Sequence, residues 1–219
     1  ASQVSTLAAT ANSVANVSAT AASIGNSYAL DAAANVVADL GQVNEGTGTS
    51  TVATVYSAVS DVTETAASIG NSGSFNADGA LLDVAVDQNN LGDQTAALLT
   101  VQNMVAEATS TAASIGNSLS VEMPGGSKIT ATQNNAGTMI ADLTGTIAST
   151  VDYTATAAAI GNSYALTSLD SGLAGNVSSS LNQWNGAGQI AKVTANIAAS
   201  TNAAATAAAI GNSVSINVK

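Results

Sequence analysis

The residues that could do chemistry are few, and their spacing matches no common catalytic site. The chain contains no Cys and no His, so thiolate nucleophiles, disulfides, imidazole bases and the usual zinc ligands are absent. Ser is plentiful, but a Ser-His-Asp triad needs a His, and no motif supports a Ser–Lys dyad. The four glutamates, Glu45, Glu64, Glu107 and Glu122, fall at different positions of the repeat described below. The sequence therefore indicates no pair of carboxylates for acid–base catalysis, and we expect neither a catalytic residue nor enzymatic activity.

One stretch resembles part of a calcium-binding loop. Residues 87–92 read D-Q-N-N-L-G, which has the D-x-N-x-x-G spacing of an EF-hand. The twelfth position of that loop is Leu98, where an EF-hand requires a bidentate Glu. A structural turn is therefore the expected role, although Asp83, Asp87 and Asp93 could still gather Ca²⁺ with low affinity. No other cofactor or metal is expected.

Aromatic rings and Thr rows are the remaining candidates for binding. Trp184 lies beside a segment of variable length and is the best candidate for an exposed contact with a sugar, whereas Tyr56 and Tyr153 are expected to face inward. Thr-x-Thr at 63–65 and 154–156 hints at an ice-binding row, but the other repeats interrupt it. A monomeric ice-binding or carbohydrate-binding module is therefore the alternative function.

The charge balance excludes several partners. The net charge is −11, there is no Arg, and the only positively charged side chains are those of Lys128, Lys192 and Lys219. Nucleic-acid binding needs clustered positive charge, and anionic lipid is disfavoured for the same reason. No run of 18 apolar residues predicts a membrane-spanning helix. The start at Ala1 fits cleavage after secretion or an artificial boundary, and secretion is the expectation.

A tandem repeat must position these residues. The phrase T-A-A-[SA]-I-G-N-S occurs five times, with its Ile at intervals of 45, 46, 45 and 50 residues. A second motif, Gln-x-Asn, occurs four times, each time with its Gln 27 residues before the next of these Ile residues. All variation in length therefore lies between I-G-N-S and the following Gln, and this segment is expected to contain a surface loop.

The period of the apolar residues favours strands. From Met139 to Tyr153, apolar or small residues occupy the odd positions, with Val151 among them, and Thr or Asp occupies most even ones. Val52, Val55, Val59 and Val62 would also fit one face of a helix. The abundance of β-branched residues and Thr favours the strand interpretation in all repeats.

A unit of this size cannot bury its own edges, but stacked units pair each strand with its equivalents above and below. The predicted fold is all-β: a β-solenoid of about five stacked strand–arc–strand repeats of about 45 residues. We expect a single repeat domain over 1–219, with a partial repeat at 1–27, full repeats at 28–72, 73–118, 119–163 and 164–213, and a strand at 214–219 that begins an incomplete one. Identical positions then become ladders: Ile24, Ile69, Ile115, Ile160 and Ile210; Asn26, Asn71, Asn117, Asn162 and Asn212; and Gln42, Gln88, Gln133 and Gln183.

The two ends of the chain are expected to complete one another. Neither end has the Pro or charge cluster that usually blocks the edge of a stack. Unlike surfaces that join without closing give a filament. The predicted polymerisation interface comprises Leu7, Val14 and Val17 from one end and Val214, Ile216 and Val218 from the other. A monomer whose ends fray is the alternative.

The motifs resemble the curlin family, whose strand–arc–strand repeats carry regularly spaced Gln, Gly and Asn. The resemblance rests on S-L-N-Q-W-N-G at 180–186, on I-T-A-T-Q-N-N-A-G at 129–137 and on the I-G-N-S arcs. The repeat here is nearly twice as long and richer in Ala. The resemblance implies a secreted bacterial fibre of the functional-amyloid type, serving adhesion, biofilm matrix or surface attachment, and curlin-like proteins of holdfast anchors are similar. The expected partners are further copies of the chain and a polysaccharide or surface.

Overall fold

The computed structural model describes residues 1–77, 79–169 and 177–218. These residues form strands and short connections, and none of them is helical, so the described part offers no helix that could span a membrane. The all-β expectation is confirmed. The strands are β1 (Gln3–Asn12), β2 (Asn16–Ala32), β3 (Val36–Asn44), β4 (Gly48–Ala77), β5 (Leu82–Asn90), β6 (Gln94–Pro124), β7 (Lys128–Asn135), β8 (Met139–Ile147), β9 (Thr150–Leu169), β10 (Ser178–Asn185), β11 (Gln189–Ile197) and β12 (Ser200–Val218).

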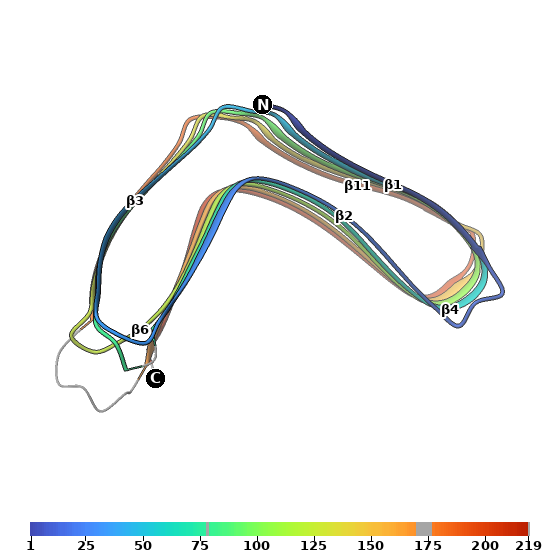
Figure 1. Ribbon diagram of the computed structural model, residues 1–219. Coiled ribbons are helices and arrows are strands. Elements are labelled where there is room, and N and C mark those ends of the chain that lie inside the picture. Colours follow the sequence, from blue (N-terminus) through green and yellow to red (C-terminus); the bar gives the residue numbers. More distant parts are fainter. Residues whose placement is uncertain (78, 170–176, 219) are drawn as a thin grey trace.

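All strand pairing is parallel and joins equivalent positions of successive repeats. One sheet has the order β1-β4-β6-β8-β11, and β2, β9 and β12 join it through β4 and β6. The second sheet has the order β10-β7-β5-β3. The chain follows nearly the same path in each repeat, so that the traces overlie one another along the view in Figure 1. We call each pass, beginning at β1, β4, β6, β8 and β11, a coil.

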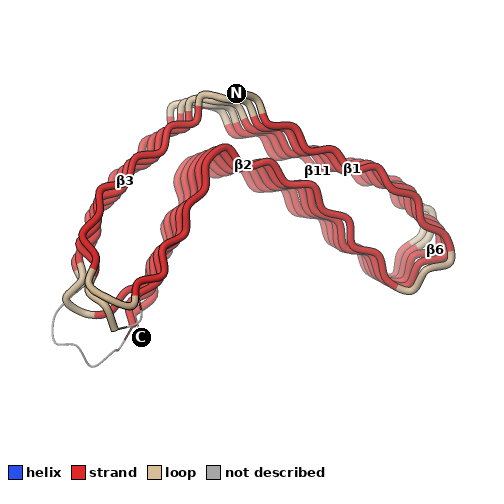
Figure 2. Tube along the Cα trace, viewed as in Figure 1, coloured by secondary structure: helices blue, strands red, loops and turns tan. Residues whose placement is uncertain are grey.

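Each coil has a bent, flattened cross-section with two arms. In the first coil, β1 runs outward along the first arm, β2 returns along it and continues into the second arm, and β3 runs back along the second arm (Figures 1 and 2). The I-G-N-S phrase lies in the middle of the returning strand. In β2, residues 16–24 precede the bend and lie opposite β1, and residues 26–32 follow the bend and lead to β3. The repeat boundaries expected at 27/28, 72/73, 118/119, 163/164 and 213/214 thus fall inside strands.

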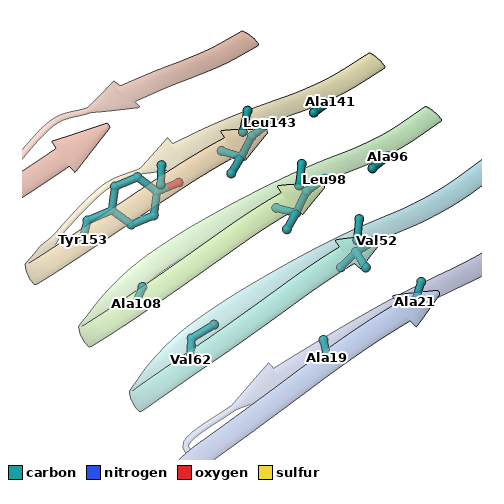
Figure 3. Packing of buried hydrophobic residues seen from close by; sticks show 14 of the residues in the cluster. Ala19, Ala21, Val52, Val62, Ala96, Leu98, Ala108, Ala141, Leu143 and Tyr153 are labelled. Atoms are coloured by element: carbon teal, nitrogen blue, oxygen red, sulfur yellow. The ribbon is translucent and has the colours of Figure 1, made fainter. Parts of the chain in front are cut away.

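Alanine is the commonest residue in the core of the first arm, beside larger residues. Leu98, Val52 and Leu143 from the outgoing strands face Ala108, Val62 and Tyr153 from the returning strands, as Figure 3 shows. The alternation of apolar with polar residues produces this arrangement, because successive side chains of a strand point to opposite faces. Ala at many inner positions keeps the two layers close together. The thin core explains why a chain with so few aromatic residues still buries an apolar interior.

Alanine is less frequent in the core of the second arm. Its core contains Phe75, Leu119 and Tyr164 from the returning strands and Leu82 and Ile129 from the strands opposite, all almost fully buried. The connections that lead to β3, β5 and β7 lie at the tip of this arm, where the sequence predicted a loop of variable length. The longest copy of that loop includes residues 170–176, which lie outside the described residues.

The expectation of one inward face from Met139 to Tyr153 is wrong at Ser149 and Val151, although it holds at Tyr153. The strand is interrupted at residues 148–149, Thr150 is buried and Val151 is 50% exposed, and the odd positions are buried again from Tyr153 onward. The tip of the first arm causes this shift, since the chain reverses there. Equivalent residues in the first three coils, Ser13, Ala58 and Met104, adopt φ values of 57°, 54° and 54° at this reversal. The helical alternative for residues 52–62 is also wrong, because all of them lie in β4.

Candidate functional site

A column of Asn side chains crosses the coils at the I-G-N-S bend. Each amide donates from Nδ2 to Oδ1 of the equivalent Asn in the next coil, at 2.8 Å in all four steps. The members are Asn26, Asn71, Asn117, Asn162 and Asn212. The same Nδ2 also donates to a backbone carbonyl of the facing strand, as Asn117 does to Asn134 at 2.8 Å. The column therefore ties neighbouring coils together and joins the two layers within a coil.

The Gln residues of the Gln-x-Asn motif form a second column, and the hydrogen bonds between their side chains run in the opposite direction. Each amide donates to the preceding coil, at 2.8, 2.8 and 2.7 Å for Gln88 to Gln42, Gln133 to Gln88 and Gln183 to Gln133. Each also donates to the Ser carbonyl of an I-G-N-S phrase, as Gln133 does to Ser163 at 2.9 Å. Gln88 and Gln133 have no exposed surface. Two amide columns of opposite direction thus lie on the two layers of the bend.

Sequence reasoning missed a third amide column, formed by the Asn of the Gln-x-Asn motif. Asn44 donates to Asn90, Asn90 to Asn135 and Asn135 to Asn185, each at 2.8 Å. These side chains lie against the I-G-N-S glycines: a Cβ at Gly116 would overlap Asn135 Oδ1 and the carbonyl oxygen of Gly161. The signal was present, because this Asn recurs two residues after every Gln of the motif.

The Ile column lies on the outer face of the returning strands. Ile24, Ile69, Ile115, Ile160 and Ile210 are placed in register by the parallel pairing. Ile24 is 43% exposed and Ile210 37% exposed, whereas the buried interior at this level is formed by Ala and Ser. The column stacks methyl groups between coils without contributing to the closed core.

Both ends of the stack leave strand edges open among the described residues. β1, β2 and β3 pair only with β4 and β5, and β10, β11 and β12 pair only with β7, β8 and β9. Of the residues predicted for polymerisation, Leu7 and Val17 pack partly buried on the inner face of the first coil. Val214 and Ile216 are 52% and 61% exposed, and the backbone of Val218 pairs with Ser168. Val14 lies outside these inner positions, in the connection between β1 and β2.

A carboxyl group that the sequence did not single out is buried in the first arm. Glu64 has no exposed surface, and its two oxygens accept hydrogen bonds from Thr54 Oγ1 and from Ser110 Oγ, the latter at 2.8 Å. Burial raises the pKa of Glu64 above its ordinary value, and the hydrogen bonds to the carboxylate only partly oppose this. The hydroxyl groups of Tyr56 and Tyr153, which are buried as expected, have no hydrogen-bond partner among the described residues.

Two of the three acidic residues considered for calcium make contacts with other groups of the chain. Asp83 forms an exposed ion pair with Lys128 at 3.9 Å, and Asp93 Oδ1 accepts from the backbone nitrogen of Thr138 at 2.7 Å. Asp87 lies on the outer face of β5 beside the paired strand β7. Across the described ranges, no group of three or more acidic, His or Cys side chains could hold a metal ion.

Comparison with known proteins identifies a family for this chain. No curated protein and no solved structure matches the chain significantly. A family model, that of HfaD, holdfast attachment protein D, matches residues 56–219, which comprise most of β4 and every later strand. The match includes four of the five I-G-N-S phrases and three of the four Gln-x-Asn motifs. The chain therefore belongs to the holdfast attachment protein D family.

Proposed function

We propose that this chain is a β-solenoid structural subunit that assembles head to tail into a filament at the bacterial cell surface, where it serves attachment. Membership of the holdfast attachment family supports the attachment role and the extracellular or surface location. The parallel stacking of coils in register supports the solenoid class. The resemblance to curlins supports a fibre of the functional-amyloid type, which could contribute to a biofilm matrix.

The direction of the Asn column is the observation that carries the head-to-tail arrangement. Each Asn donates to the coil that follows it in the chain, and no hydrogen bond within the described residues reaches Asn26 Oδ1. At the other end, Asn212 Nδ2 has only a long contact of 3.4 Å with the carbonyl oxygen of Gln183. One end therefore offers an acceptor and the other a donor in the same column. Two identical ends could not satisfy each other in this way.

The apolar columns support the same junction. If the register inside the chain continues across it, Leu7 of the second copy lies over Val193, and Val17 lies over Ala203. Tyr28 and Leu30 then lie over Val214 and Ile216. All of these are inner positions, so joining two copies would bury apolar side chains that the free ends leave in water. Val14 would contribute little, because it lies outside these columns.

The C-terminal edge has little protection against such pairing. β12 contains no charged residue, and the inner alanines of its first part are exposed, whereas their equivalents in β9 are fully buried. Edge strands of soluble proteins usually carry charges, Pro or bulges that prevent pairing. The open edges of β11 and β12 therefore fit a surface that is covered by another copy.

The decisive experiment changes one inner side chain of the open edge and compares it with its outward neighbour. Ile216→Lys would place a charge inside the junction, and Ser215→Lys would place the same charge outside it. We expect filaments in negative-stain microscopy for the parent chain and for Ser215→Lys, and no filaments for Ile216→Lys or for a chain that lacks residues 214–219. Filaments of unchanged length and number in all four samples would rule out the proposed junction.

A further inference from the structure

Trp184 lies on the outer face of the second arm, in a shallow depression of about 440 Å³. Two outward-facing columns of β5, β7 and β10 line it: Asp87, Thr132 and Asn182 form one, and Asn89, Asn134 and Trp184 form the other. Neighbouring strands are about 4.8 Å apart, and alternate residues of a strand about 6.7 Å. The lined area therefore measures about 10 by 7 Å, which is the size of one or two sugar rings.

An amide column is interrupted at Trp184. Asn134 donates to Asn89 Oδ1 at 2.8 Å, but Asn134 Oδ1, which would accept from an Asn at position 184, has no partner within the described residues. The flanking Gln and Asn columns both cross from β7 to β10, at 2.7 and 2.8 Å. Position 184 thus lacks the hydrogen bond that an Asn would supply, and it carries a large ring instead.

The indole ring is exposed and lies against the neighbouring backbone. Trp184 is 55% exposed, although burial of an aromatic ring is normally favourable. The ring lies over Gly186, since a Cβ at that glycine would overlap three of its atoms. The ring therefore packs against the backbone at Gly186 while the residue stays more than half exposed.

The groups around the ring determine the class of ligand. Thr132 supplies a hydroxyl, Asn182 supplies an amide with donors and acceptors, and Asp87 supplies a carboxylate, whereas none of the described residues that line the depression is a cation. An aromatic face next to neutral and acidic hydrogen-bonding groups fits the C–H face and the hydroxyl groups of a sugar. Asp87 and the net charge of −11 disfavour acidic sugars.

We propose that Trp184, Asn182, Thr132 and Asp87 form a binding site for an uncharged oligosaccharide on the side of the solenoid. The site faces outward from the stack of coils, so it does not depend on the proposed filament. In a filament it would recur once per subunit, and many weak sites would then act together on one polysaccharide.

Trp184 is the only Trp of the chain and reports on its own site. We would titrate cellotetraose, maltotetraose and, as the acidic contrast, tetragalacturonate into the chain, and follow Trp emission together with titration calorimetry. Both the parent chain and Ile216→Lys would be used, so that the result is independent of assembly. We expect saturable binding of at least one neutral tetrasaccharide, and at least tenfold weaker binding of the acidic one.

Trp184→Asn is the informative variant because it restores the missing amide of the column. We expect it to melt at or above the temperature of the parent chain and to lose at least tenfold in affinity by calorimetry. Val43→Asn, at the equivalent outward position of β3 and outside the depression, should bind as the parent does. Absence of saturable binding to either neutral sugar, or undiminished binding by Trp184→Asn, would overturn the proposal.

Discussion

Replacement of Asn117 by Ala tests how much the amide columns contribute to the fold. Asn117 is fully buried and makes three hydrogen bonds at 2.8 Å, with Asn71, Asn162 and the carbonyl oxygen of Asn134. At a net value of about 1 kcal/mol each, their loss costs about 3 kcal/mol. The carbonyl oxygen of Asn134 and Oδ1 of Asn162 would lose these donors in a dry environment. The total loss should therefore be about 3–5 kcal/mol.

Asn212→Ala is the matched control, because Asn212 occupies the same column at its open end. It accepts one hydrogen bond of 2.8 Å from Asn162 and is exposed. We expect a loss of about 1 kcal/mol. Urea unfolding, followed by circular dichroism and by Trp emission, measures both values, and the slope m must stay constant for the comparison to hold. The Ile216→Lys background avoids stabilisation by assembly.

Equal losses for the two variants would refute the reasoning, because the columns would then contribute no more in the interior than at the open end. A loss below about 1 kcal/mol for Asn117→Ala would do the same, since it would mean that water or a shifted neighbour replaces all three hydrogen bonds.

Three further substitutions test separate features. Burial raises the pKa of Glu64, so the folded chain binds its proton more tightly than the unfolded chain does. The stabilisation of the fold by this tighter proton binding is complete below about pH 4.5 and is lost as the pH rises through the raised pKa. Glu64→Gln should therefore melt at a higher temperature than the parent at neutral pH and show a flatter dependence on pH, and a parallel dependence would contradict this. Ala58→Gly relieves a φ of 54° and should stabilise the chain by about 1 kcal/mol in urea unfolding. Gly116→Ala, whose Cβ would overlap a backbone oxygen, should cost about 2–3 kcal/mol in the same assay, and an unchanged midpoint would show that the bend can relax.

The all-β architecture could be predicted because the repeat imposes the same spacing on every copy. A Gln that always lies 27 residues before the Ile excludes insertions, and fixed spacing over several copies is what stacked strands require. The positions of the Asn and Gln columns follow from the same spacing. Their hydrogen bonds, however, depend on which face each amide points to, and that is determined by the bend at I-G-N-S, where Gly70 and Asn71 are both buried.

The reversal at the tip of the first arm could not be predicted from the residues present. Positive φ values usually coincide with Gly or Asn, whereas Ser13, Ala58 and Met104 occupy this position. The surrounding strands impose the conformation, so the local sequence carries no signal of it. Without that reversal, the alternation from Met139 to Tyr153 looks continuous, and Val151 is placed on the wrong face.

Glu64 was missed for a different reason. The alternation places Glu64 on the inner face, since Val62 and Ala66, two residues before and after it, are buried. A charged side chain in such a pattern is usually a sign that the face is exposed, because burial of an unpaired carboxylate is costly. Here Thr54, from the opposite side of the same coil, and Ser110, from the next coil, supply its hydrogen bonds, and the folded path of the chain is needed to bring them together.

The hydrogen bonds of the stack run along its axis, and this direction matters for attachment. Inside one chain, covalent connections also join each coil to the next, so tension along the axis is not borne by hydrogen bonds alone. In the proposed filament the junction between copies would have no such connection, and its strength would come from backbone pairing, apolar columns and the Asn column together. The donor at Asn212 and the acceptor at Asn26 would then matter more than any interior pair, because an imperfect register at the junction would leave both unsatisfied. Strength under load is therefore expected to depend on the residues of the two open ends before those of the interior.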